Sequence, residues 1–223
     1  MTADRFRLRG VVLPGVFHPR SDSWLLARAA TRQGLAPGAR VLELCAGPAF
    51  AGLVAARSAH GRLTTVDVSR RAQLNAWLNG RLNGVPVRAL RGDLLAPVAG
   101  ERFDLILANP PYVPGPPPPA RGAARAWDAG SDGRALLDRI CALAPAHLAP
   151  GGTLLLVHSD IVGAEATLHA YTARGLAADV AERERGPLGP LVRERRDVLE
   201  QEGLLRADQD DEDVLVIRGR AAA

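Results

Sequence analysis

A short, mostly apolar run and a turn of small residues follow one another in the stretch Val41-Leu42-Glu43-Leu44-Cys45-Ala46-Gly47-Pro48-Ala49. Such a run, with β-branched and leucine side chains, is typical of a strand buried on both faces of a sheet. A helical pattern starts at Phe50 and continues to about residue 60, so the turn connects a strand to a helix. In open α/β sheets, ligands bind at such connections, beside backbone N–H groups and a helix N-terminus. The stretch therefore predicts an α/β fold with a ligand site at residues 45–49.

The alternation of strands and helices extends along the rest of the chain. Further strands are predicted over residues 63–66, 85–90, 103–108, 152–157, 177–182 and 213–217, and further helices over residues 69–83, 132–147, 163–174 and 193–201. Apolar strands that alternate with helices predict a doubly wound, mostly parallel α/β sheet of seven strands.

Short connections favour a single domain over residues 1–223, with a small N-terminal flap over residues 1–35. Within this flap we expect a strand over residues 11–17, followed by a helix that Ser21 or Asp22 caps.

The composition excludes several classes of protein. The chain has 223 residues, of which 47% are hydrophobic and 23% charged, as in ordinary globular domains. Its two cysteines, Cys45 and Cys141, are too few for a disulfide scaffold and are interpreted as reduced thiols. No apolar run is long enough to span a bilayer, and the N-terminus lacks the pattern of a signal peptide. We therefore expect a cytoplasmic protein without membrane contact.

The basic charge is carried entirely by arginine. All 28 basic residues are arginine, and the formal net charge is +4. Arginine binds phosphate bidentately, which keeps nucleic acid among the candidate partners. The arginines are dispersed, however, and the densest stretch, residues 183–196, also contains Glu184 and Glu194. This pattern favours a solvated surface over a phosphate-binding track.

Two carboxylates follow neighbouring predicted strands at positions suited to a nucleoside. Asp67 ends the second strand, 20 residues past Gly47, where a carboxylate can accept hydrogen bonds from both hydroxyls of a ribose. Asp93, in Arg91-Gly92-Asp93-Leu94, follows the third strand, where it can accept from an adenine amino group. The turn has one glycine where a dinucleotide fingerprint has three, and no Gly-Lys-Ser/Thr follows it, which excludes a phosphate-cradling loop.

The most specific motif is Asn109-Pro110-Pro111-Tyr112, directly after the fourth strand. A planar amide or base NH₂ attacks a methyl group poorly unless its two hydrogens are held while the nitrogen becomes pyramidal. The side-chain oxygen of Asn109 and the carbonyl of Pro110 can accept those hydrogens. Consecutive prolines stiffen the loop and remove competing N–H donors. Tyr112 supplies an aromatic face for a flat substrate group, so the motif predicts methylation of a planar nitrogen.

Together with Glu43, Asp67 and Asp93, this motif resembles that of the class I S-adenosylmethionine (SAM)-dependent N-methyltransferases. More closely, residues 16–217 resemble the release-factor glutamine methyltransferases and their short eukaryotic and archaeal relatives. The resemblance implies a Rossmann-like sheet with an antiparallel last strand, SAM as cofactor and S-adenosyl-L-homocysteine as product. No Cys/His grouping has metal-ligand spacing, so we expect no metal. The resemblance implies catalytic roles for Asn109, Pro110, Pro111 and Tyr112. It implies cofactor contacts for Ser23, Glu43, Cys45, Ala46, Gly47, Asp67, Asp93, Leu94 and Asn109.

Flanking segments extend the resemblance. Residues 17–23 are similar to the family's Pro-x-x-acid-Ser/Thr segment, which closes over the cofactor, and residues 128–133 are similar to its Gly-rich stretch. The proline-rich run at 114–119 cannot be helix or central strand, and residues 113–130 are predicted to form a substrate lid.

The chain departs from the family pattern in three ways. Cys45 and Ala49 stand where the family has glycine, and Pro48 removes one backbone N–H. The helical N-terminal domain that bacterial members use to dock their substrate is absent from this sequence.

Four functions remain open. The leading one is methylation of a glutamine side chain in a protein, such as the Gly-Gly-Gln loop of a peptide chain release factor. The alternatives are an amino-methyltransferase acting on adenine N6 or guanine N2 of RNA or DNA, a small-molecule N-methyltransferase, and a SAM-binding module without catalysis. Short members of the family work with a small zinc-containing partner, and the need for an activating subunit stays open. His18 and His158 are interpreted as structural, because an amide held by Asn109 needs little base assistance.

Overall fold

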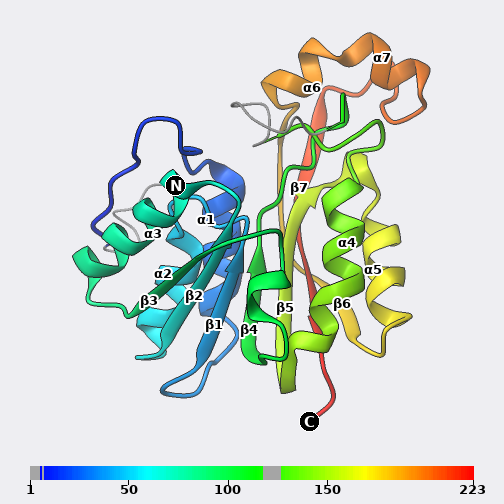
Figure 1. Cartoon of the computed structure of the whole chain (residues 1–223). Coiled ribbons are helices and arrows are strands. Elements are labelled where there is room, and N and C mark those ends of the chain that lie inside the picture. The colour runs from blue at the N-terminus through cyan, green and yellow to red at the C-terminus, as the bar shows by residue number, and fades with distance from the viewer. Residues whose placement is uncertain (1–5, 7, 118–126) are drawn as a thin grey trace.

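The computed structural model describes residues 6, 8–117 and 127–223. A seven-stranded sheet forms its centre, in the order β3-β2-β1-β4-β5-β7-β6 (Figure 1). The strands are β1 (Arg40–Leu44), β2 (Arg62–Asp67), β3 (Val87–Arg91), β4 (Phe103–Ala108), β5 (Leu148–Ser159), β6 (Ala177–Pro187) and β7 (Asp211–Arg220). The first five strands are parallel, and β7 is antiparallel to both β5 and β6. The predicted doubly wound, mostly parallel sheet with an antiparallel last strand is confirmed.

The order of the strands fixes where a ligand site belongs. The chain starts in the middle of the sheet with β1, proceeds outward to β3, and returns to place β4 on the other side of β1. In open α/β sheets this reversal leaves a crevice at the carboxyl ends of the strands on either side of it. The loops after β1 and β4 therefore meet at one edge of the sheet, and these loops carry residues 45–49 and 109–112.

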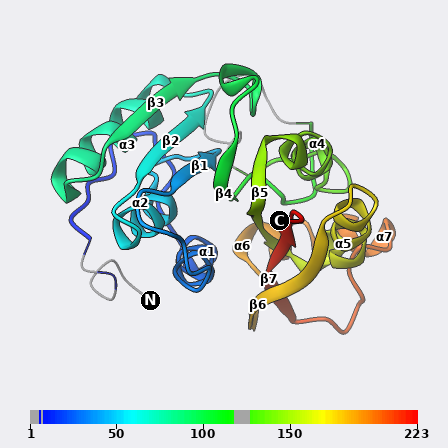
Figure 2. The same ribbon diagram turned by 90° about the horizontal axis from the view of Figure 1, so that it is seen from below.

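Helices cover both faces of the sheet. On one face lie α1 (Ser21–Thr31), α2 (Phe50–Ser58) and α3 (Arg70–Asn83), and on the other α4 (Ala135–Leu143) and α5 (Ala164–Thr172) (Figures 1 and 2). Residues of β4 alternate between the two apolar cores, with Leu105 and Leu107 facing one and Ile106 and Ala108 the other. This burial on both faces explains the continuous apolar run that predicted the strand.

Two connections differ from the regular strand–helix alternation. Between β3 and β4 the chain forms only the short 3₁₀ turn η2 (Ala96–Val98). Between β6 and β7 it forms α6 (Pro190–Glu194) and α7 (Arg196–Gln201), which lie beyond the carboxyl edge of the parallel strands (Figure 1). The single helix expected over residues 193–201 is therefore two short helices that meet at Arg195. In the part of the chain that the structure describes, no helix is long and apolar enough to cross a membrane.

The N-terminal segment is held by side chains instead of a β-ladder. Asn75, Asn79 and Asn83 lie one turn apart on α3 and accept hydrogen bonds from the backbone N–H groups of Leu13, Val11 and Arg9 at 2.8, 2.9 and 3.0 Å. The side-chain amides of the same asparagines donate back to the carbonyls of Val11 and Arg9. The expected strand over residues 11–17 is wrong, because the asparagine ladder takes the backbone groups that a neighbouring strand would need.

Candidate active site

The turn after β1 places three residues in the left-handed region. Cys45, Gly47 and Ala49 have φ of 53°, 51° and 62°. For a residue with a side chain this conformation costs roughly 1–2 kcal/mol, which glycine avoids. The turn therefore keeps its tight path at Cys45 and Ala49 by accepting backbone strain, and the strain explains why the resembling family has glycine there.

Asp67 joins this turn from the end of β2. One carboxylate oxygen, Oδ2, accepts a hydrogen bond from Gly47 N–H at 3.0 Å, and Oδ1 accepts from Ser69 N–H at 2.8 Å. The structure thus brings together the two residues that the sequence paired at a spacing of 20. The carboxylate lies where α2 and α3 begin, so it is set beside two helix N-termini at the carboxyl edge.

Glu43 lies beneath the turn. Its carboxyl group is buried and accepts a hydrogen bond from Gly52 N–H at 2.8 Å. Burial raises the pKa of Glu43 to about 8, the Gly52 N–H opposes the shift, and Asp67 adds to it. At pH 7 the carboxyl group is therefore mostly protonated in the structure as described. A cation placed in the adjoining cleft would favour its ionised form.

Asp93, the second of the two carboxylates predicted to contact a nucleoside, is engaged by an arginine. Asp93 follows β3 and forms an exposed ion pair with Arg139 of α4, at 2.6 Å between Oδ2 and Nη2. Its neighbour Leu94 is buried and has a φ of 47°, again in the left-handed region. Such an outlier in a non-glycine residue is a reason to suspect a functional constraint. An adenine contact for Asp93 and Leu94 stays a prediction.

The motif after β4 is held by the first turn of α1. Asn109 Nδ2 donates to Ser23 Oγ at 3.2 Å, and the Tyr112 hydroxyl donates to Asp22 Oδ2 at 3.3 Å. Pro110 and Pro111 are buried between them. Burial, together with Asp22, raises the pKa of the Tyr112 phenol well above its usual value. The hydroxyl therefore stays protonated and donates a hydrogen bond, and it is not available as a base.

Asp22 is a site residue that sequence reasoning did not identify. It was expected to cap α1, but the residue before the helix is Arg20 and no side chain caps it. The buried Asp22 carboxylate accepts instead from the backbone N–H and hydroxyl of Ser23 and from Tyr112. Its place in the segment that resembles the family's Pro-x-x-acid-Ser/Thr motif was the available signal.

Six of the twelve predicted site residues line one small cleft. It encloses about 30 Å³, and its walls are formed by Phe17, Ser23, Leu26, Glu43, Cys45, Ala46, Gly47, Pro48, Phe50, Ala51 and Asn109. Asp67 stands behind Gly47, whereas Asp93 and Leu94 do not line the cleft. His158 is buried away from these residues, with its ring nitrogens bonded to Ser159 O and Thr167 Oγ1, and burial lowers its pKa to about 4. These contacts give His158 a structural role.

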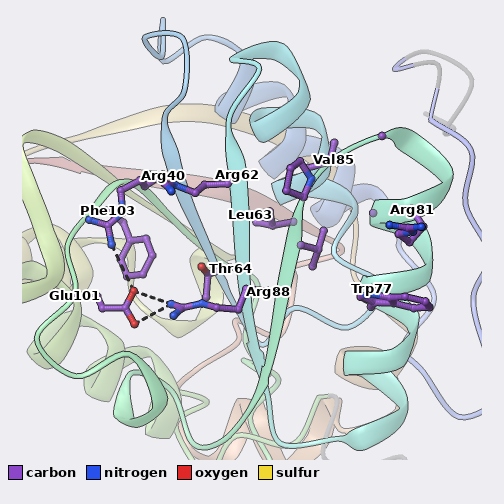
Figure 3. A pocket seen from close by; sticks show the side chains of 14 residues that line it. Arg40, Arg62, Leu63, Thr64, Trp77, Arg81, Val85, Arg88, Glu101 and Phe103 are labelled. Atoms are coloured by element: carbon purple, nitrogen blue, oxygen red, sulfur yellow. Dashed lines mark hydrogen bonds and ion pairs between the residues drawn. The ribbon is translucent and has the colours of Figure 1, made fainter.

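A larger groove lies at the opposite edge of the sheet. It encloses about 790 Å³ and is lined by the first residues of β1 and β2, Arg40 and Arg62, and by Trp77, Arg88 and Glu101 among others (Figure 3). Glu101 bonds both Arg40 and Arg88, at 3.4 and 2.7 Å (Figure 3). By size alone, this groove would be the preferred candidate for a binding site. The motif at residues 109–112, which is predicted to hold the methyl acceptor, lies at the other edge of the sheet.

A family model for the methyltransferase small domain matches residues 11–179. The chain belongs to this methyltransferase family. Among curated relatives, it is 29% identical to a putative protein N5-glutamine methyltransferase of Methanocaldococcus jannaschii, over 80% of this chain and 90% of that protein. It is 32% identical to mouse methyltransferase HEMK2, over 74% of this chain and 82% of that protein.

The methyltransferase is also similar to longer bacterial enzymes and to solved structures. It is 33% identical to the release factor glutamine methyltransferase of Geobacter sulfurreducens over 74% of this chain, but spans only 60% of that enzyme. Its fold matches Mtq2 of E. cuniculi, solved with Trm112, with a TM-score of 0.64 and 21% identity over 93% of this chain and 99% of that one. It also matches the 16S rRNA N2 G1207 methyltransferase of T. thermophilus, solved with AdoMet and guanosine, with a TM-score of 0.62 and 20% identity over 94% of this chain and 46% of that one. These structural matches establish the class I methyltransferase fold.

Proposed function

We propose that this methyltransferase transfers a methyl group from SAM to the side-chain amide nitrogen of a glutamine in a protein, such as a peptide chain release factor. The observation that carries the proposal is the position of Asn109. Its Nδ2 donates to Ser23, which directs the amide group, and in the described residues no hydrogen bond engages its Oδ1. That oxygen is the group an acceptor NH₂ needs. The names of the curated relatives support a glutamine acceptor.

The residues at the carboxyl edge have the chemistry that SAM requires. Asp67 provides a carboxylate for ribose hydroxyls, Glu43 and Ser23 add polar groups to the cleft, and Cys45, Ala46 and Gly47 form the tight turn beside it. When bound, SAM supplies an electrophilic methyl group on a positively charged sulfonium. A cleft of about 30 Å³ is far smaller than the roughly 300 Å³ or more of ligand pockets, so we expect Phe17 and its flap to move when SAM enters.

The loop after β4 then performs the acceptor chemistry. The Asn109 oxygen and the Pro110 carbonyl accept the two amide hydrogens, and this interaction strengthens as the nitrogen becomes pyramidal. Tyr112, fixed through Asp22, offers its ring to the flat amide group. Once the new N–CH₃ bond has formed and the S–CH₃ bond has broken, the acceptor nitrogen passes one proton to water, so no buried base is required. We assign the whole chain to one methyltransferase domain, with residues 1–35 as its flap and 113–130 as its substrate lid; residues 118–126 of that lid lie outside the described part.

Labelled SAM tests the proposal directly. Purified protein is incubated with tritiated SAM and a fractionated lysate, and then with a purified release factor and its Gln→Asn variant in the Gly-Gly-Gln loop. We expect label in protein, at that glutamine by mass spectrometry, with weak dependence on salt. Label in RNA or DNA with steep salt dependence would replace the glutamine proposal by a nucleic-acid one. Label in metabolites would indicate a small-molecule acceptor. SAM binding without any methyl transfer would indicate a SAM-binding module that needs a partner.

One structural feature favours protein over nucleic acid. The connection between β6 and β7, residues 188–210, lies beyond the carboxyl edge and carries six carboxylates against four arginines (Figure 1). Acidic groups at the approach to a site repel a phosphate backbone.

The need for an activating partner requires a separate assay. Methyl transfer by the chain alone and with an added Trm112-type protein tests whether it needs the kind of partner with which Mtq2 was solved.

A further inference from the structure

Arg195 connects two parts of the molecule that lie far apart in the sequence. It stands where α6 ends and α7 begins, and its side chain points to the loop after β4. Nη1 donates to the Pro114 carbonyl at 2.8 Å, and Nη2 donates to Asp128 Oδ1 at 2.6 Å. The Asp128 carboxylate is buried and Arg195 is mostly so, with side chains 7% and 21% exposed. An ion pair this far from solvent is screened little by water or salt.

The guanidinium bridges the two ends of the proline-rich loop. Val113 N–H donates to Trp127 O at 2.9 Å, and Gly115 N–H donates to Gly130 O at 2.9 Å, so the outgoing and returning segments run side by side. Arg195 bonds one group from each segment. This arrangement starts one residue after Tyr112.

Gly115 makes room for the guanidinium. A Cβ added at Gly115 would lie 2.1 Å from Arg195 Nη1, far inside contact distance. The atom that it would meet is the end of a flexible side chain, which can move away without disrupting the fold. Gly115 has no positive φ, so alanine fits its backbone conformation. Glycine at this position is therefore explained by the approach of Arg195.

An apolar cluster completes the connection. Residues 188–210, here called the cap, contribute four buried side chains that pack together with Ile161, and Val113 packs against them; the four are Leu188, Val192, Leu199 and Leu205. The cap is thus attached to the loop after β4 in two ways: by the apolar contact of Val113 and by the ion pair of Arg195 with Asp128.

We propose that Arg195 is a positioning residue for the methyl acceptor, and that the cap it fastens forms one wall of the acceptor site. Arg195 does not touch the reacting atoms. It sets the direction in which the chain leaves Tyr112 and holds the two ends of the proline-rich loop against the cap. This inference rests on the proposed function, because it assigns the wall to the protein acceptor of that reaction.

Two variants remove the connection by different means. Arg195→Ala removes the guanidinium, and Gly115→Ala displaces it while leaving Arg195 in the chain. Arg185→Ala is the matched control, because Arg185 of β6 also forms an ion pair with an aspartate, Asp211, but lies outside the cap and is exposed. Loss of acceptor contacts that are equally strong in the ground state and the transition state raises KM and leaves kcat unchanged. We therefore expect both variants to raise the KM for a release-factor acceptor about 10- to 100-fold, with the Kd for SAM near that of Arg185→Ala. Arg195→Ala should also lower the melting temperature, because it leaves the buried Asp128 carboxylate unpaired. Gly115→Ala keeps the arginine in the chain and so separates the change in KM from a loss of stability.

The double variant makes the test sharper. If both changes act through the guanidinium, Gly115→Ala adds nothing in the Arg195→Ala background, and Arg195→Lys restores part of the loss by keeping one donor. Additive rises in KM in the double variant, or an unchanged KM in both single variants, would overturn the proposal. A rise in KM accompanied by a larger fall in SAM affinity would also overturn it, because it would place Arg195 at the cofactor site.

Amide hydrogen exchange separates this inference from the proposed function. It needs no acceptor, and we expect faster exchange at the hydrogen-bonded amides of Val113, Gly115, Ala129 and Gly130 in Arg195→Ala but not in Arg185→Ala. Unchanged exchange would refute the fastening role of Arg195. Failure of the wild-type protein to methylate any protein glutamine would refute the proposed function, while the exchange data would still decide whether Arg195 orders this loop.

Discussion

The two edges of the parallel strands differ in the volume of their cavities and in the functional groups that line them. The larger cavity does not hold the predicted site residues. The groove at the amino edge encloses about 790 Å³, and its carboxylate Glu101 is already shared between Arg40 and Arg88. The cleft at the carboxyl edge encloses about 30 Å³, yet it unites Asn109, Ser23 and the buried Glu43 beside the turn that Asp67 supports.

The difference follows from the way that a parallel sheet is built. Helices that follow parallel strands begin at the carboxyl edge, so their free N–H groups and positive dipole ends gather there. The amino edge receives only the returning ends of helices. Its groove is open because a 3₁₀ turn, η2, takes the place of a helix between β3 and β4. Space at that edge is therefore a result of a short connection, and we expect it to be separate from methyl transfer.

The largest effect is expected from Asn109→Ala at the carboxyl edge. If the Asn109 oxygen holds the acceptor NH₂ as its nitrogen becomes pyramidal, the loss falls on kcat more than on KM. By analogy with the removal of one preorganised polar group elsewhere, kcat should fall ~10²–10³-fold. Single-turnover methyl transfer measures it, and calorimetry should find SAM binding changed far less.

Asn109→Asp is the matched variant. It keeps an acceptor oxygen but adds a negative charge beside the sulfonium, so it should bind SAM at least as well and turn over slowly. Near-wild-type rates for Asn109→Ala would refute the amide-holding mechanism. They would also remove the main reason to prefer the smaller cleft over the larger groove.

A smaller loss, in cofactor affinity, is expected from Asp67→Ala. Hydrogen bonds to a charged group contribute ~1.5–3 kcal/mol each, so the Kd for SAM should rise roughly tenfold to several hundredfold. The change also releases Gly47 N–H, which Asp67 now holds at 3.0 Å. Asp93→Ala should cost less, because one hydrogen bond to adenine is at stake. Wild-type SAM affinity in Asp67→Ala, measured by calorimetry, would exclude Asp67 from the site.

The buried carboxyl group of Glu43 should make stability depend on pH. Its pKa is about 8 in the folded protein against the ordinary value of 4.5, so the folded state keeps a proton that the unfolded state releases. The contribution is complete below the unfolded pKa and is lost as pH rises through the folded pKa. Relative to Glu43→Gln, the wild-type free energy of unfolding should fall by at most ~1.4 kcal/mol per pH unit between pH 5 and 8. Urea unfolding at several pH values measures the difference, and parallel curves for the two proteins would contradict it.

The smallest effect is expected at the amino edge. Arg62→Ala and Trp77→Ala change exposed side chains of the groove and should leave kcat, KM and SAM affinity within about twofold of wild type. Methyl-transfer assays with purified acceptor check this. A large loss in either variant would mean that the groove takes part in the reaction, and the contrast between the two edges would fail.

Much of the fold and part of the site could be predicted from sequence. The strand pattern placed β1 through β4 within a few residues, and the proximity of Asp67 to Gly47 followed because the carboxyl ends of parallel strands meet. The contacts of Asp22 with Tyr112 and of Arg195 with Pro114 could not be predicted, since each joins residues about 80 or more apart through side-chain direction alone. The expected strand over residues 11–17 failed for a related reason, as asparagine side chains hydrogen-bond the backbone in a way that strand propensity does not register.

The asparagine ladder has a consequence for how the protein loses activity on heating. Residues 9–13 are held on α3 mainly by side-chain amides, and the chain leads from there through Phe17 to Asp22 and Ser23, which hold Tyr112 and Asn109. Segments tied down by few apolar contacts open locally at a lower free energy than the whole domain. Thermal inactivation should therefore precede melting of the sheet. A shortened N-terminus should widen the temperature interval in which the protein is folded but catalytically inactive.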